Sequence, residues 1–130
     1  MNLNRLKLRM KTTMSRSSRD KGNRREREVR ALLHDMGINA RRTYSMQSAE
    51  KGNADLLTEN IVGQVAWEVK GCEELRLTSW LQQLAYQREH YKDASNLLVF
   101  KQSRKPAMYV GYLDQLPQTV RVLKPFLSDG

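Results

Sequence analysis

Large apolar residues alternate with small or charged ones along residues 65–70, in the order Val-Ala-Trp-Glu-Val-Lys. Successive side chains of a strand point to opposite faces of a sheet, so this period of two predicts a β-strand. The apolar residues would pack against a core, while Glu68 and Lys70 would share the other face, about 6.6 Å apart along the chain. A chain with this segment must therefore build a sheet that buries one face and carries charge on the other.

A second short apolar run lies just upstream. The sequence Ala54-Asp55-Leu56-Leu57 is typical of a neighbouring strand, and Gly63 falls in the short connection between the two runs. Two apolar runs with a turn glycine between them predict a β-hairpin. If these strands pair, Asp55 reaches the same end of the sheet as Glu68.

Two carboxylates and an ammonium group on adjacent strands have the layout of a divalent-metal site that cuts phosphodiesters. Mg²⁺ prefers oxygen ligands and is usually held by one or two carboxylates together with substrate phosphate. An ordinary solvated strand face with a Glu–Lys pair explains the same spacing equally well. His34 and His90 lie far apart in the sequence and lack the partners of a zinc site, so we expect both on the surface.

Residues 23–36 show the spacing of an amphipathic helix that ends at Gly37. Its apolar positions are Val29, Leu32, Leu33 and Met36. At 100° per residue, Glu26 lies in line with Leu33 at one edge of this stripe, whereas Glu28 lies at the opposite edge. This spacing favours Glu26 as the acid that faces the sheet. The alternative is that both glutamates serve only as first-turn acids against the helix dipole.

These motifs occur in a characteristic order. Residues 21–28 read Lys-Gly-Asn-Arg-Arg-Glu-Arg-Glu and residues 37–42 read Gly-Ile-Asn-Ala-Arg-Arg; a serine-bearing loop, Asp55 and the Glu-Val-Lys strand follow. Over residues 21 to about 71 this order resembles the PD-(D/E)XK nuclease superfamily, and more narrowly the archaeal-type Holliday junction resolvases. Ala54 stands where many members of the superfamily have the proline that names the motif.

The resemblance implies an α/β, restriction-endonuclease-like core with a central mixed β-sheet of about five strands flanked by helices. It also implies a metal-dependent endodeoxyribonuclease that acts on branched or duplex DNA, resolves Holliday junctions by paired cuts and uses Mg²⁺ (or Mn²⁺ as a substitute). Because a junction has two-fold symmetry and needs two opposed cuts, we expect a homodimer. Glu26, Asp55 and Glu68 would be metal ligands, helped by the Val69 carbonyl, and Lys70 the catalytic lysine. The implied DNA-binding residues are Lys21, Arg24, Arg25, Arg27, Arg42, Ser45 and Lys51.

Two other function classes fit the same residues. The core could serve a restriction, mismatch or flap nuclease, because a fold does not determine its substrate. A non-catalytic basic DNA-binding module is the alternative outside the enzymes.

The charge distribution favours a nucleic-acid partner. The chain has 23 Lys and Arg against 14 Asp and Glu, a net charge of +9, and residues 1–30 alone hold 11 basic and 3 acidic residues. Such an excess predicts salt-sensitive binding to phosphate backbones, although a basic tail that serves only solubility is an alternative. We expect residues 1–20 to be a disordered arm, or a transit peptide, and residues 21–130 to be a single nuclease domain.

Hydropathy and cysteine content bear on the cellular compartment. The sequence shows neither a signal peptide nor a membrane-spanning run of 18 apolar residues. The single cysteine, Cys72, suits a reducing compartment. We therefore expect a cytoplasmic protein, or one of the host cytoplasm if its source is a virus.

The C-terminal half is predicted to complete the scaffold. Thr78 would cap a helix that runs to about residue 93; we expect Leu81, Leu84, Ala85 and Tyr91 on its buried face and Gln87 largely outside it. The pair Gln87 and Tyr91 resembles a motif of some exonucleases in the superfamily. Residues 96–101 and 108–113 read as strands around a basic turn, and the prolines Pro117 and Pro125 predict at most one short helix near the end.

Overall fold

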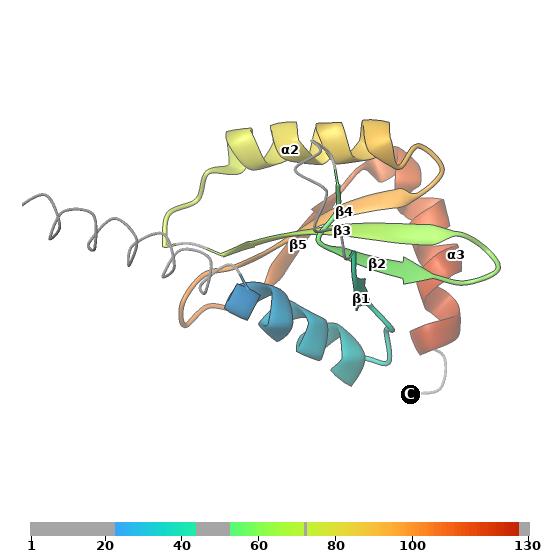
Figure 1. The fold of residues 1–130 in the computed structure, drawn as a ribbon, viewed down its shortest axis with the longest axis horizontal. Helices are drawn as coiled ribbons and strands as arrows, with labels where there is room; N and C mark the ends of the chain where they lie inside the picture. Colours follow the sequence, from blue (N-terminus) through green and yellow to red (C-terminus); the bar gives the residue numbers. More distant parts are fainter. Residues whose placement is uncertain (1–22, 44–52, 72, 128–130) are drawn as a thin grey trace, which may run out of the picture.

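The computed structural model describes residues 23–43, 53–71 and 73–127. The predicted arm (residues 1–20) and Cys72 lie outside these ranges. Within the described ranges the chain forms three layers, with a sheet between helices (Figure 1).

The central layer is a five-stranded mixed sheet with the strand order β1-β2-β3-β4-β5. Its strands are β1 (Arg41–Arg42), β2 (Leu56–Glu59), β3 (Gln64–Gly71), β4 (Ser95–Lys101) and β5 (Met108–Gly111). β3 and β4 are parallel, whereas the other neighbouring strands pair antiparallel. The predicted α/β core with a mixed sheet of about five strands is therefore confirmed.

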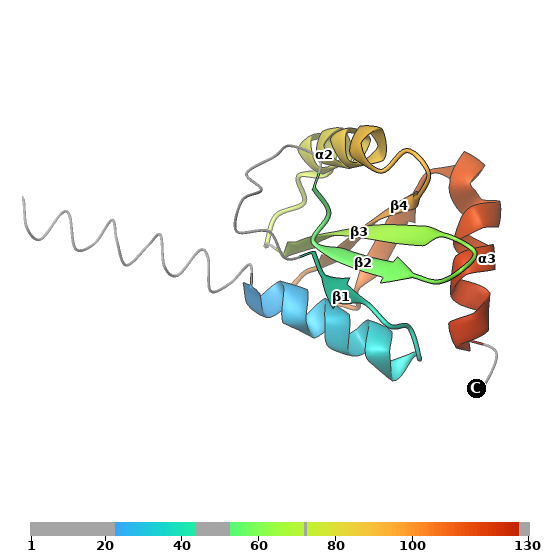
Figure 2. The ribbon, with the colours of Figure 1, turned by 45° about the vertical axis from the view of Figure 1, so that its right-hand side comes forward.

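Helices cover both faces of this sheet (Figure 2). The helix α2 (Leu77–His90) connects β3 to β4, and Trp80 and Leu84 pack against Phe100 on one face. The helix of residues 23–35 and α3 (Leu116–Leu127) lie on the other face, where Val29 and Val122 join a core with alternate residues of β3 and β4. A short 3-10 helix, η1 (Leu113–Gln115), leads into α3.

The predicted hairpin is formed by β2 and β3, which pair antiparallel with Leu56 opposite Trp67. The side chain of Asn60 closes its turn, because Asn60 Oδ1 accepts hydrogen bonds from the backbone N–H groups of Val62 (2.9 Å) and Gly63 (3.1 Å). The first strand begins at Leu56, two residues later than the sequence suggested. Asp55 therefore lies just before the strand and not within it.

The helix of residues 23–35 ends where predicted. Gly37 adopts a φ of 91°, and a Cβ there would lie 2.6 Å from the carbonyl oxygen of Phe126 in α3. Glycine thus both ends the helix and allows α3 to approach. The predicted apolar stripe is only half right: Val29 and Leu33 are buried, but Leu32 and Met36 are 39% and 56% exposed.

The buried face of α2 differs from the prediction. The helix begins at Leu77, so Thr78 is its second residue and not its cap. Leu81 is 39% exposed, whereas Gln87, which was expected outside the buried face, is fully buried. The amide of Gln87 explains this position, because its Nε2 donates to the carbonyl oxygen of Ala66 and to Asn96 Oδ1, both at 3.0 Å.

The helix α3 is longer than the short helix predicted for this region, since it runs through both prolines. Pro117 occupies the first turn, where the missing N–H would have no intrahelical acceptor, and Pro125 lies near the end, where few turns remain to be disrupted. Burial of Val122 against the sheet stabilises the intervening residues. Among the described residues, no helix has the length and apolar character needed to span a membrane.

An apolar groove of about 640 Å³ opens between the helix of residues 23–35, β5 and α3. Several large apolar side chains on its walls are about half exposed or more. They are Met36, Met108, Tyr109, Leu116, Val120 and Leu127. The groove lies beside β5, which is an edge strand of the sheet.

We predict that the buried amide of Gln87 contributes measurably to folding. Gln87→Met keeps a side chain of similar length but leaves the carbonyl of Ala66 and the side chain of Asn96 without this donor, so it should lower the free energy of unfolding by about 1–3 kcal/mol. Urea denaturation measures the effect. Gln83→Met, at an exposed position of the same helix, is the matched control, and equal stability of the two variants would contradict the prediction.

Candidate active site

Glu68 and Lys70 lie on the same face of β3, as the alternation of the strand predicts. Glu68 is 9% exposed, and Lys70 Nζ lies 3.3 Å from Glu68 Oε1. The neighbours Trp67 and Val69 contribute to the core on the opposite face. The alternating strand therefore holds a nearly buried carboxylate against the ammonium group of a lysine whose side chain is 25% exposed.

Asp55 reaches these two residues through the hairpin. Its backbone N–H donates to the carbonyl oxygen of Trp67 (2.9 Å), and its Oδ2 accepts a hydrogen bond from the N–H of Val69 (2.8 Å). The Asp55 and Glu68 carboxyl groups lie close enough that each shifts the pKa of the other. Asp55 thus belongs to the same cluster although it precedes β2.

Glu26 approaches this cluster from the helix of residues 23–35. Its Oε1 lies 2.6 Å from Arg42 Nε at the edge of the sheet, and its side chain is 15% exposed. Glu28 instead pairs with Arg25 on the same helix, at 3.0 Å, and is 39% exposed. The more buried acid is therefore Glu26, as the helical spacing favoured.

The acids of the cluster oppose one another electrostatically. Burial, and then the charge of Asp55, raise the pKa of Glu68 to about 7, while Lys70 acts in the opposite direction. Burial raises the pKa of Asp55, although the N–H of Val69 and the charge of Lys70 lower it. The pKa of Glu26 is also raised, by burial and then by the charge of Asp55, with Arg42 opposing both. A positive charge placed at the cluster would relieve this unfavourable burial.

Asp55 and Glu68 suit a hard divalent cation, because they offer adjacent, largely buried oxygen donors whose ionisation burial disfavours. Among the described residues, no group of three or more His, Cys, Asp or Glu side chains is arranged to hold a metal ion. Glu26 is instead engaged by Arg42. The arrangement therefore supports a site with two carboxylates, and the roles of Glu26 and of the Val69 carbonyl as ligands stay predictions.

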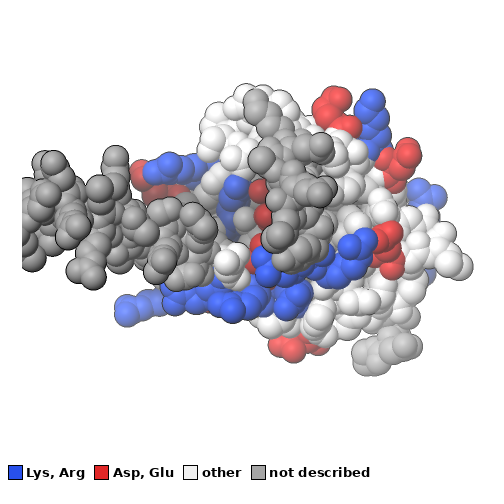
Figure 3. All heavy atoms as spheres, viewed as in Figure 1, with Lys and Arg blue, Asp and Glu red and all other residues white. Residues whose placement is uncertain are grey.

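The predicted DNA-binding residues have different environments. Arg24 and Arg27 are exposed on the helix of residues 23–35, and Arg42, on β1, is 45% exposed beside Glu26. Figure 3 shows Lys and Arg side chains gathered along the side of the molecule formed by this helix and β1. Lys21, Ser45 and Lys51 lie outside the described residues.

Arg25 has internal contacts in addition to its pairing with Glu28. Its Nη2 donates to Ser103 Oγ at 3.2 Å, in the turn between β4 and β5. A Cβ at Gly71 would overlap the Arg25 side chain, so this arginine packs directly against the end of β3. Arg25 therefore links the helix to the end of the sheet that carries Lys70.

Sequence reasoning missed two residues that support Asp55. Thr43, just after β1, and Tyr91, at the end of α2, both contact the segment before β2. The sequence suggested Tyr91 as a residue of the buried face of the predicted helix and as half of a possible motif with Gln87, but not as a neighbour of Asp55. The structure gives these two residues separate contacts, since Gln87 is bonded to the sheet and Tyr91 to the residues next to Asp55.

Solved structures contain the same fold. The chain aligns with Hjc, a Holliday junction resolvase from the hyperthermophilic archaeon Archaeoglobus fulgidus, at 26% identity and a TM-score of 0.52, over 70% of this chain and 72% of Hjc. It also aligns with SSO0001 at 16% identity and a TM-score of 0.52, over 87% of this chain but only 61% of SSO0001, which shows the fold alone. No protein-family model and no curated protein matches the sequence.

We predict that Glu68 makes the metal-free protein less stable as the pH rises. Because its pKa in the folded state, about 7, lies above the value of about 4.3 expected when unfolded, stability should fall between about pH 4.5 and 7 as the buried group ionises. Glu68→Gln removes this titration. The difference in free energy of unfolding between the variant and the wild type should therefore shift by about 1–3 kcal/mol in favour of the variant as the pH rises from 5 to 8.

Urea denaturation in EDTA at the two pH values measures this difference. Glu89→Gln, which replaces an exposed carboxyl group on α2, is the matched control and should follow the wild type. Parallel pH dependence of Glu68→Gln and the wild type would contradict the prediction.

Proposed function

We propose that this chain is a metal-dependent, structure-specific endodeoxyribonuclease that resolves Holliday junctions by paired cuts. The chain has the fold of the archaeal-type Holliday junction resolvases, which confirms the resemblance read from its sequence. The observation that carries this proposal is a pair of largely buried carboxylates, Asp55 and Glu68, with the Lys70 ammonium group 3.3 Å from Glu68 Oε1. The likeness to Hjc supports the choice of substrate.

The three groups have complementary roles in this proposal. Asp55 and Glu68 would hold Mg²⁺ or Mn²⁺, which when bound supplies positive charge against the scissile phosphate and lowers the pKa of a bound water. Lys70 would orient the attacking water or offset the charge that develops on the phosphate oxygens. Its contact with Glu68 keeps the ammonium group beside the carboxylates while a quarter of its side chain remains exposed. Glu26, fixed by Arg42, would anchor a second ion or its water.

The basic side of the molecule would bind the DNA backbone. Arg24 and Arg27 are exposed on the same helix as Glu26, and Arg42 connects this helix to the sheet edge near Asp55. Their positive charge would attract phosphates on either side of the cut and position the duplex. Lys21, Arg25, Ser45 and Lys51 are proposed to extend this contact.

A homodimer with one active site per subunit is the assembly that we propose. A four-way junction has two-fold symmetry and needs two opposed cuts, which a symmetric pair of subunits supplies. The apolar groove beside β5 supports self-association, because a second copy would bury its half-exposed side chains. The proposed interface includes Leu116 and Val120 of α3.

Cleavage of immobile four-way junctions in Mg²⁺ tests the proposed function. We expect symmetric cuts in the junction, and much slower cutting of a linear duplex of equal length. Asp55→Asn and Glu68→Gln should abolish cleavage but leave binding to the junction in EDTA, because the basic residues remain. Equal cutting of both substrates would indicate a nuclease of another specificity, and binding without any cleavage by the wild type would indicate a non-catalytic module.

Lys70→Ala refines the same test. If the ammonium group acts on the reacting phosphate, the turnover number of the variant should be at least about 100-fold lower than that of the wild type. Its affinity for the junction should change little. Lys92→Ala, at an exposed position after α2, is the control. Weaker binding with an unchanged turnover number would show that the role assigned to Lys70 is wrong.

We predict that Val120→Glu prevents dimer formation. Val120 is 51% exposed on the groove, so the variant should fold, but a carboxylate buried without a partner disfavours the interface. Light scattering coupled to size-exclusion chromatography would measure the mass. Arg121→Glu, at the next, exposed position of α3, is the control and should remain dimeric; a monomeric wild type, or a dimeric Val120→Glu, would contradict the proposed interface.

A further inference from the structure

We propose that Tyr91, together with Thr43, positions the active site by fixing the segment of residues 53–55, so that the Asp55 carboxylate faces Glu68. This inference rests on the proposed function, because it assigns a purpose to the position of Asp55. Neither residue is proposed to touch the substrate. Both act through the backbone and side chain of the segment that precedes β2.

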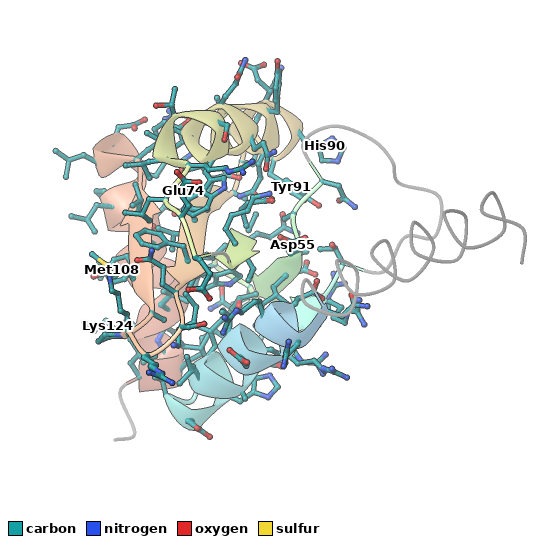
Figure 4. The ribbon with its side chains drawn as sticks, turned by 90° about the vertical axis from the view of Figure 1, so that its left-hand side faces the viewer. Asp55, Glu74, His90, Tyr91, Met108 and Lys124 are labelled. Carbon is teal, nitrogen blue, oxygen red and sulfur yellow. The ribbon has the colours of Figure 1, made fainter. Side chains whose placement is uncertain are left out.

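Tyr91 contacts this segment from the helical layer. Its hydroxyl donates a hydrogen bond of 2.6 Å to Asn53 Oδ1 and makes a longer contact, 3.5 Å, with the backbone N–H of Ala54. Figure 4 shows Tyr91 at the end of α2, on the side of the molecule where Asp55 lies. The phenol thus connects α2 to the residues immediately before Asp55.

The backbone of Tyr91 is itself held in place. Its N–H donates to the carbonyl oxygen of Gln87 (2.8 Å), and its carbonyl oxygen accepts hydrogen bonds from Asn96 Nδ2 (3.2 Å) and from the N–H of Ala94 (3.1 Å). Gln87 is bonded in turn to the carbonyl of Ala66 in β3. A fixed backbone and a ring with two torsion angles give the hydroxyl a defined position relative to the sheet.

Thr43 holds the same segment from the edge of the sheet. Its N–H donates to the carbonyl oxygen of Asp55 (3.2 Å), and its hydroxyl donates to the carbonyl oxygen of Ala54. β3 contributes the third set of contacts, through the carbonyl of Trp67 and the N–H of Val69. The segment is therefore held from three directions, by β1, β3 and α2.

The position of Asp55 explains why these contacts matter. Asp55 precedes β2 and so lies just beyond the paired residues of the regular sheet. Its carboxylate must stay beside Glu68, although two buried carboxylates repel one another when both are ionised. The hydrogen bonds from Tyr91 and Thr43 limit the freedom of the segment to swing away. They would thereby reduce the conformational entropy that the segment loses when a cation binds.

Tyr91→Phe tests this role, because it removes the hydroxyl and keeps the ring. The loss of one hydrogen bond of ordinary strength should weaken Mg²⁺ binding by about 5- to 10-fold. Calorimetric titration of the full chain with Mg²⁺ measures the affinity directly. The Mg²⁺ concentration for half-maximal junction cleavage should rise by the same factor, while the turnover number at saturating Mg²⁺ should stay within about 3-fold of the wild type.

Hydrogen exchange of the metal-free protein supplies a readout that needs no activity. The amide of Asp55 should exchange faster in Tyr91→Phe, while the amides of β4 should be unchanged. Thr43→Val is a second variant that loosens the segment from the other side and should act in the same direction. Tyr112→Phe is the matched control, since Tyr112 is a half-buried tyrosine that packs beside α2.

The outcomes separate the two proposals. An unchanged Mg²⁺ affinity and unchanged exchange at Asp55 in Tyr91→Phe would overturn the positioning role. Equal losses of thermal stability, junction binding and cleavage at every Mg²⁺ concentration would also overturn it, since they indicate a general structural defect. If the wild type neither binds Mg²⁺ nor cuts DNA, the proposed function is wrong; the exchange rate at Asp55 would still support or overturn the contact with Tyr91.

Discussion

The hydrogen bonds between Asp55 and β3 determine the geometry on which the rest of the site depends. The N–H of Asp55 and its carboxylate are both bonded to β3, at Trp67 and Val69. These hydrogen bonds place the Asp55 carboxylate beside β3, the strand that carries Glu68. A slip of one residue in the β2–β3 register would turn Glu68 and Lys70 toward the opposite face and separate them from Asp55. The tight turn at Asn60 opposes such a slip.

The same geometry creates an electrostatic conflict that the folded protein must tolerate. Two carboxyl groups are brought together in a largely buried place, and the raised pKa values of Asp55 and Glu68 reflect this. Neighbouring elements hold the acids together despite the conflict: Lys70 faces Glu68, Arg42 faces Glu26, and Tyr91 and Thr43 fix the segment before β2. Cores built for stability alone avoid such pairs, so their presence is characteristic of a functional site.

Some parts of this arrangement were predictable because they follow from local periodicity. The alternation around Glu68 and Lys70 identified their common face, and the helical spacing favoured Glu26 over Glu28. Other predictions were wrong because a hydrogen bond or a packing contact with a distant residue outweighed the local sequence pattern. Gln87 is buried because the carbonyl of Ala66 and the side chain of Asn96 accept its amide, and the helix through Pro117 and Pro125 is retained because Val122 packs against the sheet.

The sequence by itself determined the β2–β3 hairpin, the helix of residues 23–35, α2, β4, β5 and the residue types able to form a metal site, because these depend on side chains close together in the chain. Only the tertiary structure decided which residues meet. The pairing of Glu26 with Arg42, the packing of Arg25 against Gly71, and the contact between Tyr91 and Asn53 join residues distant in sequence. Such contacts depend on how β1, β3 and α2 pack together, and no periodic pattern within a single element carries that information.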